Sequence, residues 1–184
     1  MLAVLTVILG LAYPLAVTAV GQLAFPGRAD GSLVSVDGAV VGSSLLGQNF
    51  ADADGSPLPQ WFQPRPSAGG YDPLASGASN LGPESEELVA AIEERRAQVA
   101  EFNGVRPERV PPDALTASGS GLDPHISPDY AYLQVQRVAQ ERGLDVAAVR
   151  TLVTGHIEGR DLKFIGAPHV NVLLLNLALD QLSG

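Results

Sequence analysis

The first 25 residues constrain this chain most strongly, because Met1 to Phe25 carries no ionisable side chain. A helix of that length rises about 37 Å, and the hydrocarbon core of a bilayer is about 30 Å thick. Hydroxyl groups such as that of Thr6 can bond back to the helix's own carbonyls, so they are compatible with a spanning helix. The sequence therefore predicts a transmembrane helix over residues 1–25.

A cleavable signal peptide is the alternative for this segment, since Val17-Thr18-Ala19 resembles a small-residue cleavage site. No charged side chain precedes the apolar stretch, which is also longer than most signal-peptide cores, so we favour a retained helix. One face of this helix carries small residues and a proline, namely Gly10, Pro14, Thr18 and Gly21. Either this face packs on a partner helix, or it reflects the general use of small residues in membrane anchors.

The rest of the chain is acidic, and the formal net charge is −9 with 20 Asp and Glu against 11 Lys and Arg. The cations are dispersed, which argues against a nucleic-acid-binding surface. Cysteine is absent, which excludes disulfides, thiolate metal sites and a cysteine nucleophile. Cytoplasmic flanks of spanning helices are rich in cations, and Arg28 is the only cation in residues 26–55, so we expect the domain outside the cytoplasm.

Local patterns divide residues 26–184, which we expect to form one domain. Apolar residues that alternate around Asp37-Gly38 predict a type I′ hairpin from Leu33 to Val41. Residues 42–83 are rich in Gly, Pro and Ser and predict a loop-rich region. We expect this region to be ordered, because Trp61, Phe62 and Tyr71 gain from burial.

Residues 84–157 predict three helices that begin at Pro83-Glu84, at the cap Ser127 and at the cap Asp145. Their expected ends are Gly104, Gly143 and the neighbourhood of Gly155. Residues 168–182 predict a strand over about 169–175 that runs into a short helix. The expected fold class is α+β, with one N-terminal transmembrane helix followed by a single small mixed α/β extracytoplasmic domain.

Residues 116–128 (TASGSGLDPHISP) concentrate reactive side chains. As a serine hydrolase, the segment would use Ser118 or Ser120 as nucleophile, His125 as base and Asp123 or Asp129 to orient the base. A G-x-S-x-G elbow is missing, which argues against this interpretation. We favour a glycine-rich loop in which Ser and Asp side chains bond their own backbone.

Other sites are less well supported. The Gly-Ser run could direct amides at a phosphate, but it lacks the G-x-x-x-x-G-K-[ST] pattern and a nearby lysine. His125, His156 and His169 are widely spaced, so no metal site is predicted. Arg65, between two prolines, either offers its guanidinium to a partner's carboxylate or pairs within the domain.

Six pieces of the sequence are specific in combination: Tyr13-Pro14, 42–48 (GSSLLGQ), 62–68 (FQPRPSA), 76–83 (SGASNLGP), 116–128 and 170–176 (VNVLLLN). In this order they resemble the C subunit of the Kdp-type potassium-transporting P-type ATPase. The resemblance implies a non-catalytic subunit of a high-affinity, ATP-driven potassium import complex. It also implies a single-pass protein of the cell (inner) membrane with an extracytoplasmic domain.

The implied partners are a channel-like subunit that selects potassium, a P-type subunit that hydrolyses ATP and a small single-helix subunit. ATP and potassium would serve the complex, and no cofactor is expected on this subunit alone. The family is also described as a catalytic chaperone that raises the ATP affinity of the hydrolysing subunit, a role linked to the motif matched by Ser118, Gly119, Ser120 and Gly121. An extracytoplasmic domain cannot touch cytoplasmic ATP, so we favour a structural or ion-entry role. A membrane-tethered extracytoplasmic serine hydrolase is the alternative.

The candidate partner contacts in the apolar helix are the small-face residues Gly10, Pro14, Thr18 and Gly21. Those in the domain lie mostly within the matched pieces: Gln63, Arg65, Ser67, Asn80, Asp123, His125, Asn171 and Asn176. No catalytic residue and no metal ligand is expected.

Overall fold

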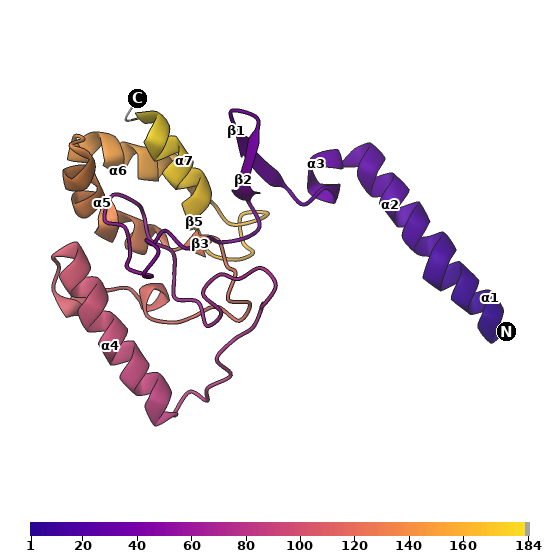
Figure 1. Cartoon of the computed structure of the whole chain (residues 1–184), viewed down its shortest axis with the longest axis horizontal. Helices are drawn as coiled ribbons and strands as arrows, with labels where there is room; N and C mark the ends of the chain where they lie inside the picture. Colours follow the sequence, from indigo (N-terminus) through magenta and orange to yellow (C-terminus); the bar gives the residue numbers. More distant parts are fainter. Residues whose placement is uncertain (183–184) are drawn as a thin grey trace. The chain divides into compact units, whose positions relative to one another are not determined.

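The computed structural model describes residues 1–182, and within them the chain forms two compact units (Figure 1). The first unit is Met1–Leu45, and the second begins at Leu46. The predicted division between residues 25 and 26 stays a prediction.

The first unit begins with an apolar helix over Leu2–Ala24, with mean hydropathy 2.2 and no buried residue in its most apolar stretch. It comprises α1 (Leu2–Val7), a π-helical turn η1 (Ile8–Ala12) and α2 (Tyr13–Ala24). The π-helical turn ends at Ala12, two residues before Pro14, whose ring lacks an N–H and would crowd the carbonyl four residues earlier in a regular helix. Within residues 1–182 this is the one helix long and apolar enough to cross a membrane.

The first unit ends in a β-hairpin. After the short helix α3 (Pro26–Ala29), β1 (Leu33–Val36) pairs antiparallel with β2 (Ala39–Ser43). Asp37 and Gly38 both have positive φ angles, 50° and 80°, as a type I′ turn requires. The hairpin prediction is therefore confirmed, with a register irregularity between Val34 and Ser35.

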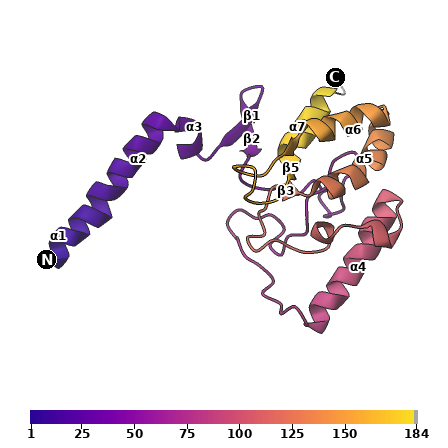
Figure 2. The ribbon, with the colours of Figure 1, turned by 180° about the vertical axis from the view of Figure 1, so that it is seen from behind.

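The described part of the second unit combines four helices with a small sheet. The helices are α4 (Glu86–Asn103), α5 (Pro128–Arg142), α6 (Val146–Gly155) and α7 (Val172–Leu182), and two 3₁₀ turns, η2 (Pro107–Arg109) and η3 (Pro112–Ala114), precede the sheet. The sheet is antiparallel in the order β3-β5-β4, from β3 (His125–Ile126), β5 (His169–Asn171) and β4 (Ile157–Glu158). Figures 1 and 2 show α5, α6 and α7 gathered beside this sheet, with α4 apart from α6 and α7.

The predicted ends of α4, α5 and α6 and the predicted starts of α5 and α6 agree with the structure. Gly104 and Gly143 adopt the left-handed conformation at φ 62° and 64° and end α4 and α5 as expected. The Ser127 hydroxyl accepts a hydrogen bond from the Tyr130 amide and caps α5. Asp145 occupies the first position before α6, but its side chain forms no capping bond.

Two predicted boundaries are wrong. Helix α4 begins at Glu86 rather than at residues 83–84, because Ser85 takes the extended N-cap position. The strand predicted over 169–175 ends at Asn171. The Asn171 side-chain oxygen accepts a hydrogen bond from the amide of Leu174 and so caps the start of α7. Helix α7 therefore begins at Val172, four residues before the first position that a strand to residue 175 would leave for it.

The core of the second unit joins the helices, the sheet and the loop-rich segment. Between β2 and α4 the described chain has no helix or strand of its own, yet Phe62 in this segment is fully buried. The same buried cluster includes Ile126, Ala131, Val135, Val138, Val149, Val153, Val170, Leu175 and Leu179. The expected order of the segment is confirmed, as is the fold class of an apolar N-terminal helix followed by a mixed helix-and-sheet domain.

Candidate functional site

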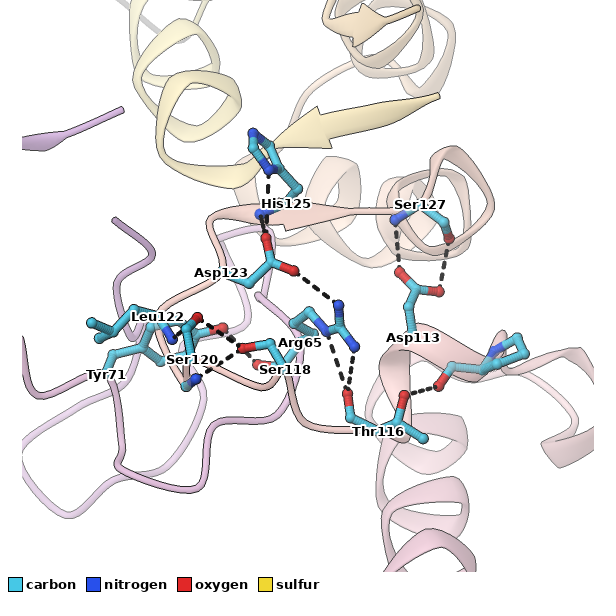
Figure 3. A network of polar contacts seen from close by, with 12 residues as sticks. Arg65, Tyr71, Asp113, Thr116, Ser118, Ser120, Leu122, Asp123, His125 and Ser127 are labelled. Atoms are coloured by element: carbon cyan, nitrogen blue, oxygen red, sulfur yellow. Dashed lines mark hydrogen bonds and ion pairs between the residues drawn. The ribbon is translucent and has the colours of Figure 1, made fainter. Parts of the chain in front are cut away.

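The segment from Ser118 to His125 forms a compact loop closed by its own side chains (Figure 3). The Ser118 hydroxyl accepts the Gly121 amide at 3.0 Å, and the Ser120 hydroxyl accepts the Leu122 amide at 3.1 Å. Asp123 Oδ1 accepts the amide of His125 at 3.0 Å. These are the local bonds that the loop interpretation predicts, in which short polar side chains satisfy backbone donors.

The carbonyl groups of the same loop bind three other segments of the chain. Ser120 O accepts the Gly77 amide at 2.9 Å and the Ser76 hydroxyl at 3.0 Å. Gly121 O accepts the Ser67 hydroxyl at 2.7 Å, and Leu122 O accepts an amide at residue 47 at 2.8 Å. The loop therefore holds together parts of the loop-rich segment that are far apart in sequence.

Gly121 is required at this junction for two reasons. Its φ of 68° is a conformation that side-chain-bearing residues rarely adopt, and a Cβ atom there would lie 2.8 Å from the carbonyl oxygen of Gly77. Gly119 is less constrained, since a Cβ atom at that position would meet no atom within 4 Å.

Arg65 and Asp123 form an ion pair beside the loop. Arg65 Nη1 lies 2.9 Å from Asp123 Oδ2, while its Nε and Nη2 both donate to the carbonyl of Thr116. Of the two alternatives for Arg65, the structure contains the pair within the domain. Burial alone would raise the pKa of Asp123, but hydrogen bonds from the side chain and backbone of His125 and from Arg65 outweigh it and lower the pKa to about 2.

Two histidines meet at the edge of this cluster. The rings of His125 and His169 lie edge to face with centroids 4.3 Å apart. His125 Nδ1 is 3.4 Å from Asp123 Oδ1, and His169 Nε2 is 3.8 Å from Glu158 Oε2. In the described chain, no three His, Cys, Asp or Glu side chains come together in a way that could hold a metal ion.

The geometry does not assemble a hydrolase triad. The hydroxyls of Ser118 and Ser120 lie 3.4 Å from each other and accept backbone amides. Neither forms a hydrogen bond with His125 among the described residues, and in Figure 3 the His125 ring extends from Asp123 away from both serines. The amides of Gly121 and Leu122 already have acceptors, which leaves these two donors unavailable to a phosphate.

A pair of buried side-chain amides is the feature that sequence analysis missed. The Asn176 amide accepts from the amide of Phe62 and donates to its carbonyl, both at 2.9 Å. The Gln134 amide does the same for Gln63, at 2.7 and 3.0 Å. We call these four bonds the amide clamp, which imitates strand pairing and fixes residues 62–63 in the core.

Arg137 supports the amide clamp through a hydrogen bond to Gln134. Its guanidinium donates to Gln134 Oε1, Asn103 Oδ1 and the carbonyls of residues 59 and 61, and stacks over the Phe102 ring at 4.4 Å. Burial lowers its pKa to about 10. Both Gln134 and Arg137 share the inward face of α5 with apolar residues, a spacing signal that could have revealed them.

The predicted partner-contact residues fall into three groups. Gly10, Pro14 and Thr18 are exposed along the apolar helix, and Gly21 is partly covered. Arg65, Ser67, Asp123 and His125 are partly buried around the loop, and Asn80 is exposed with its amide on the carbonyl of Ala78. Gln63, Asn171 and Asn176 are buried and bonded within the domain. Contact between any of them and a partner stays a prediction.

Together, the fold and the loop define an α+β domain joined to an N-terminal helix that is long and apolar enough to span a membrane. The family model described as K+-transporting ATPase, c chain, matches residues 1–181, so the chain belongs to this family.

Named relatives match along nearly the whole chain. The potassium-transporting ATPase KdpC subunit of Kineococcus radiotolerans is 62% identical over 181 residues, which cover 97% of this chain and 89% of the relative. The subunit with the same description from Gemmatimonas aurantiaca is 52% identical over 186 residues, covering 100% and 90%. That of Sorangium cellulosum is 54% identical over 185 residues, covering 98% and 93%.

Proposed function

We propose that this chain is a non-catalytic accessory subunit of a high-affinity, ATP-driven potassium importer. Leu2–Ala24 anchors it in the cell membrane, and the second unit lies outside the cytoplasm. Its partners are a channel-like subunit that selects potassium, a P-type subunit that hydrolyses ATP and a small single-helix subunit. Membership of the family and the names of the relatives support this proposal.

The single observation that carries the non-catalytic role is the internal bonding of residues 118–122. Both serine hydroxyls accept backbone amides, and three carbonyls of the loop bind residues 47, 67 and 76–77. Polar groups used in this way hold a rigid shape rather than carry out chemistry on a substrate. The domain is thus suited to stabilise an assembly.

Any effect of this subunit on ATP affinity passes through the assembled complex. An ATP phosphate at the Ser118–Gly121 motif would have to displace the serine hydroxyls from the amides of Gly121 and Leu122. On this proposal ATP and potassium serve the complex, and we expect neither to be bound by this subunit alone.

Extraction in a mild detergent tests the proposal. A tagged full chain, expressed with the other subunits, should be recovered with the larger membrane subunits, and deletion of the chain should abolish potassium uptake at low external potassium. Recovery as a monomer, with uptake unaffected by the deletion, would refute the proposal. Saturable binding of an ATP analogue to the isolated full chain would refute the indirect role in ATP affinity.

A further inference from the structure

The loop of residues 159–166, between β4 and β5, exposes three large apolar side chains. Leu162, Phe164 and Ile165 are 75%, 70% and 51% exposed. Of the other large apolar side chains exposed in the described part of the second unit, Leu74, Val89, Val146 and Leu182 occur singly, and Leu46 is exposed next to Leu45. Single exposed apolar residues are normal on a protein surface, whereas a contiguous group marks an interaction site.

Hydrogen bonds give this loop a defined shape. The amide of Lys163 donates to the carbonyl of Arg160 at 3.1 Å, and the amides of Phe164 and Ile165 donate to the carbonyl of Asp161 at 3.1 and 2.9 Å. Leu162 and Lys163 have φ angles of 50° and 72°, a region that side-chain-bearing residues rarely occupy. Such backbone conformations are concentrated at functional sites, where they present side chains in a fixed direction.

The charges of the loop distinguish between a membrane and a protein as its partner. Arg160 and Lys163 form no ion pair with any described residue. Asp161 lies between them and Glu158 directly precedes the loop, so residues 158–166 carry no net charge, and the whole chain has a formal charge of −9. An anionic bilayer would therefore not attract the loop. A protein groove, in contrast, can place a partner at each charge around an apolar centre.

We propose that residues 159–166 dock into an apolar groove on another subunit of the same transporter. Leu162, Phe164 and Ile165 fill the groove, and carboxylates at its rim pair with Arg160 and Lys163. This inference rests on the proposed function, since it names the surface through which the accessory subunit joins the complex.

Site-specific photo-crosslinking tests the contact directly. A photo-crosslinking amino acid replaces Phe164 in one full-length variant and Leu74, which is 94% exposed, in the control. In native membranes that contain the complex, we expect an adduct to an identified transporter subunit from position 164 and none from position 74. Adducts to lipid alone, or no adduct at position 164 while the complex still co-extracts, would overturn the inference and leave the proposed function standing. A chain that extracts alone would overturn both.

Truncation of the three apolar side chains provides a second measurement. The triple variant Leu162→Ser, Phe164→Ser, Ile165→Ser should lower the co-extracted complex by roughly tenfold or more, because buried apolar anchors dominate interface affinity. The control Leu74→Ser should leave co-extraction unchanged. Thermal unfolding of each purified chain should match that of the parent, since these side chains are exposed in the free subunit. Unchanged co-extraction of a folded triple variant would overturn the inference.

Discussion

The amide clamp makes a quantitative prediction about the stability of the domain. The substitution Gln134→Met keeps the length of a fully buried side chain but removes its polar atoms. The amide and carbonyl of Gln63, a residue only 8% exposed, then lose their partners on Gln134. Arg137 Nη2 loses its bond to Gln134 Oε1, while the other guanidinium nitrogens keep theirs.

The magnitude follows from these orphaned groups. A buried polar group without a partner costs about 1–3 kcal/mol, so the two backbone groups together cost about 2–6 kcal/mol. The methionine side chain recovers about 1 kcal/mol through its apolar surface. The lost bond of the charged Arg137 adds about 1.5–3 kcal/mol, so we expect Gln134→Met to lower the free energy of unfolding by about 2.5–8 kcal/mol.

The assay uses the single tryptophan as a local probe. Trp61 directly precedes the clamped residues and is partly buried, so its fluorescence reports urea unfolding of the full chain in non-ionic micelles. The control Gln136→Met places the same substitution on the exposed face of the same helix and should change stability by less than about 0.5 kcal/mol. A loss below about 1 kcal/mol for Gln134→Met would refute the reasoning.

Three further predictions concern the loop of residues 118–125. The folded state lowers the pKa of Asp123 from 3.8 to about 2, so the contribution of the Asp123 carboxylate to stability is present above pH 4 and is lost as the pH falls towards 2. Urea titration at several pH values should therefore show that the parent chain loses its stability advantage over Asp123→Asn between pH 4 and pH 2. Gly121→Ala should destabilise the chain by about 2 kcal/mol or more. The control Gly143→Ala should cost about 1 kcal/mol, because Gly143 has a similar φ of 64° but open space around its Cβ position. Equal losses of the two variants in thermal unfolding would contradict the proposed clash. Ser118→Ala and Ser120→Ala should each cost about 1 kcal/mol, because each hydroxyl satisfies one backbone amide. An ester-hydrolase activity of the parent chain that disappears in either serine variant would contradict a purely structural role.

Features set by local chemistry were predictable from the sequence. A glycine in the left-handed conformation ends α4 at residue 104 and α5 at residue 143, and Ser127 caps α5. The Asp37-Gly38 turn likewise specifies its hairpin within a few residues. Neighbours in sequence decide each of these features, so no distant contact was needed to predict them.

Features set by distant contacts were not predictable in the same way. Asn176 and Phe62 are 114 residues apart, and Gln134 and Gln63 are 71 apart, so no local pattern could pair them. The end of β5 at Asn171 was missed for two reasons, one local and one tertiary. Alternating and helical patterns overlap in residues 170–179, and pairing with β3 and β4 limits the strand to three residues.

The candidate site was predictable in its local bonds and not in its surroundings. The side chains of Ser118, Ser120 and Asp123 bond their own backbone, as short polar residues in glycine-rich loops commonly do. The anchoring of this loop by residues 47, 67 and 76–77 depends on the tertiary fold. For that reason, sequence alone left the hydrolase, phosphate-binding and structural interpretations open.

Protease treatment of spheroplasts tests most directly the claim that the N-terminal helix holds this domain outside the cytoplasm. A tagged full chain in intact spheroplasts should lose its domain to added protease, while a cytoplasmic control protein remains whole. Protection of the domain until the membrane is permeabilised would contradict the account, because it would place the domain on the side where ATP is available.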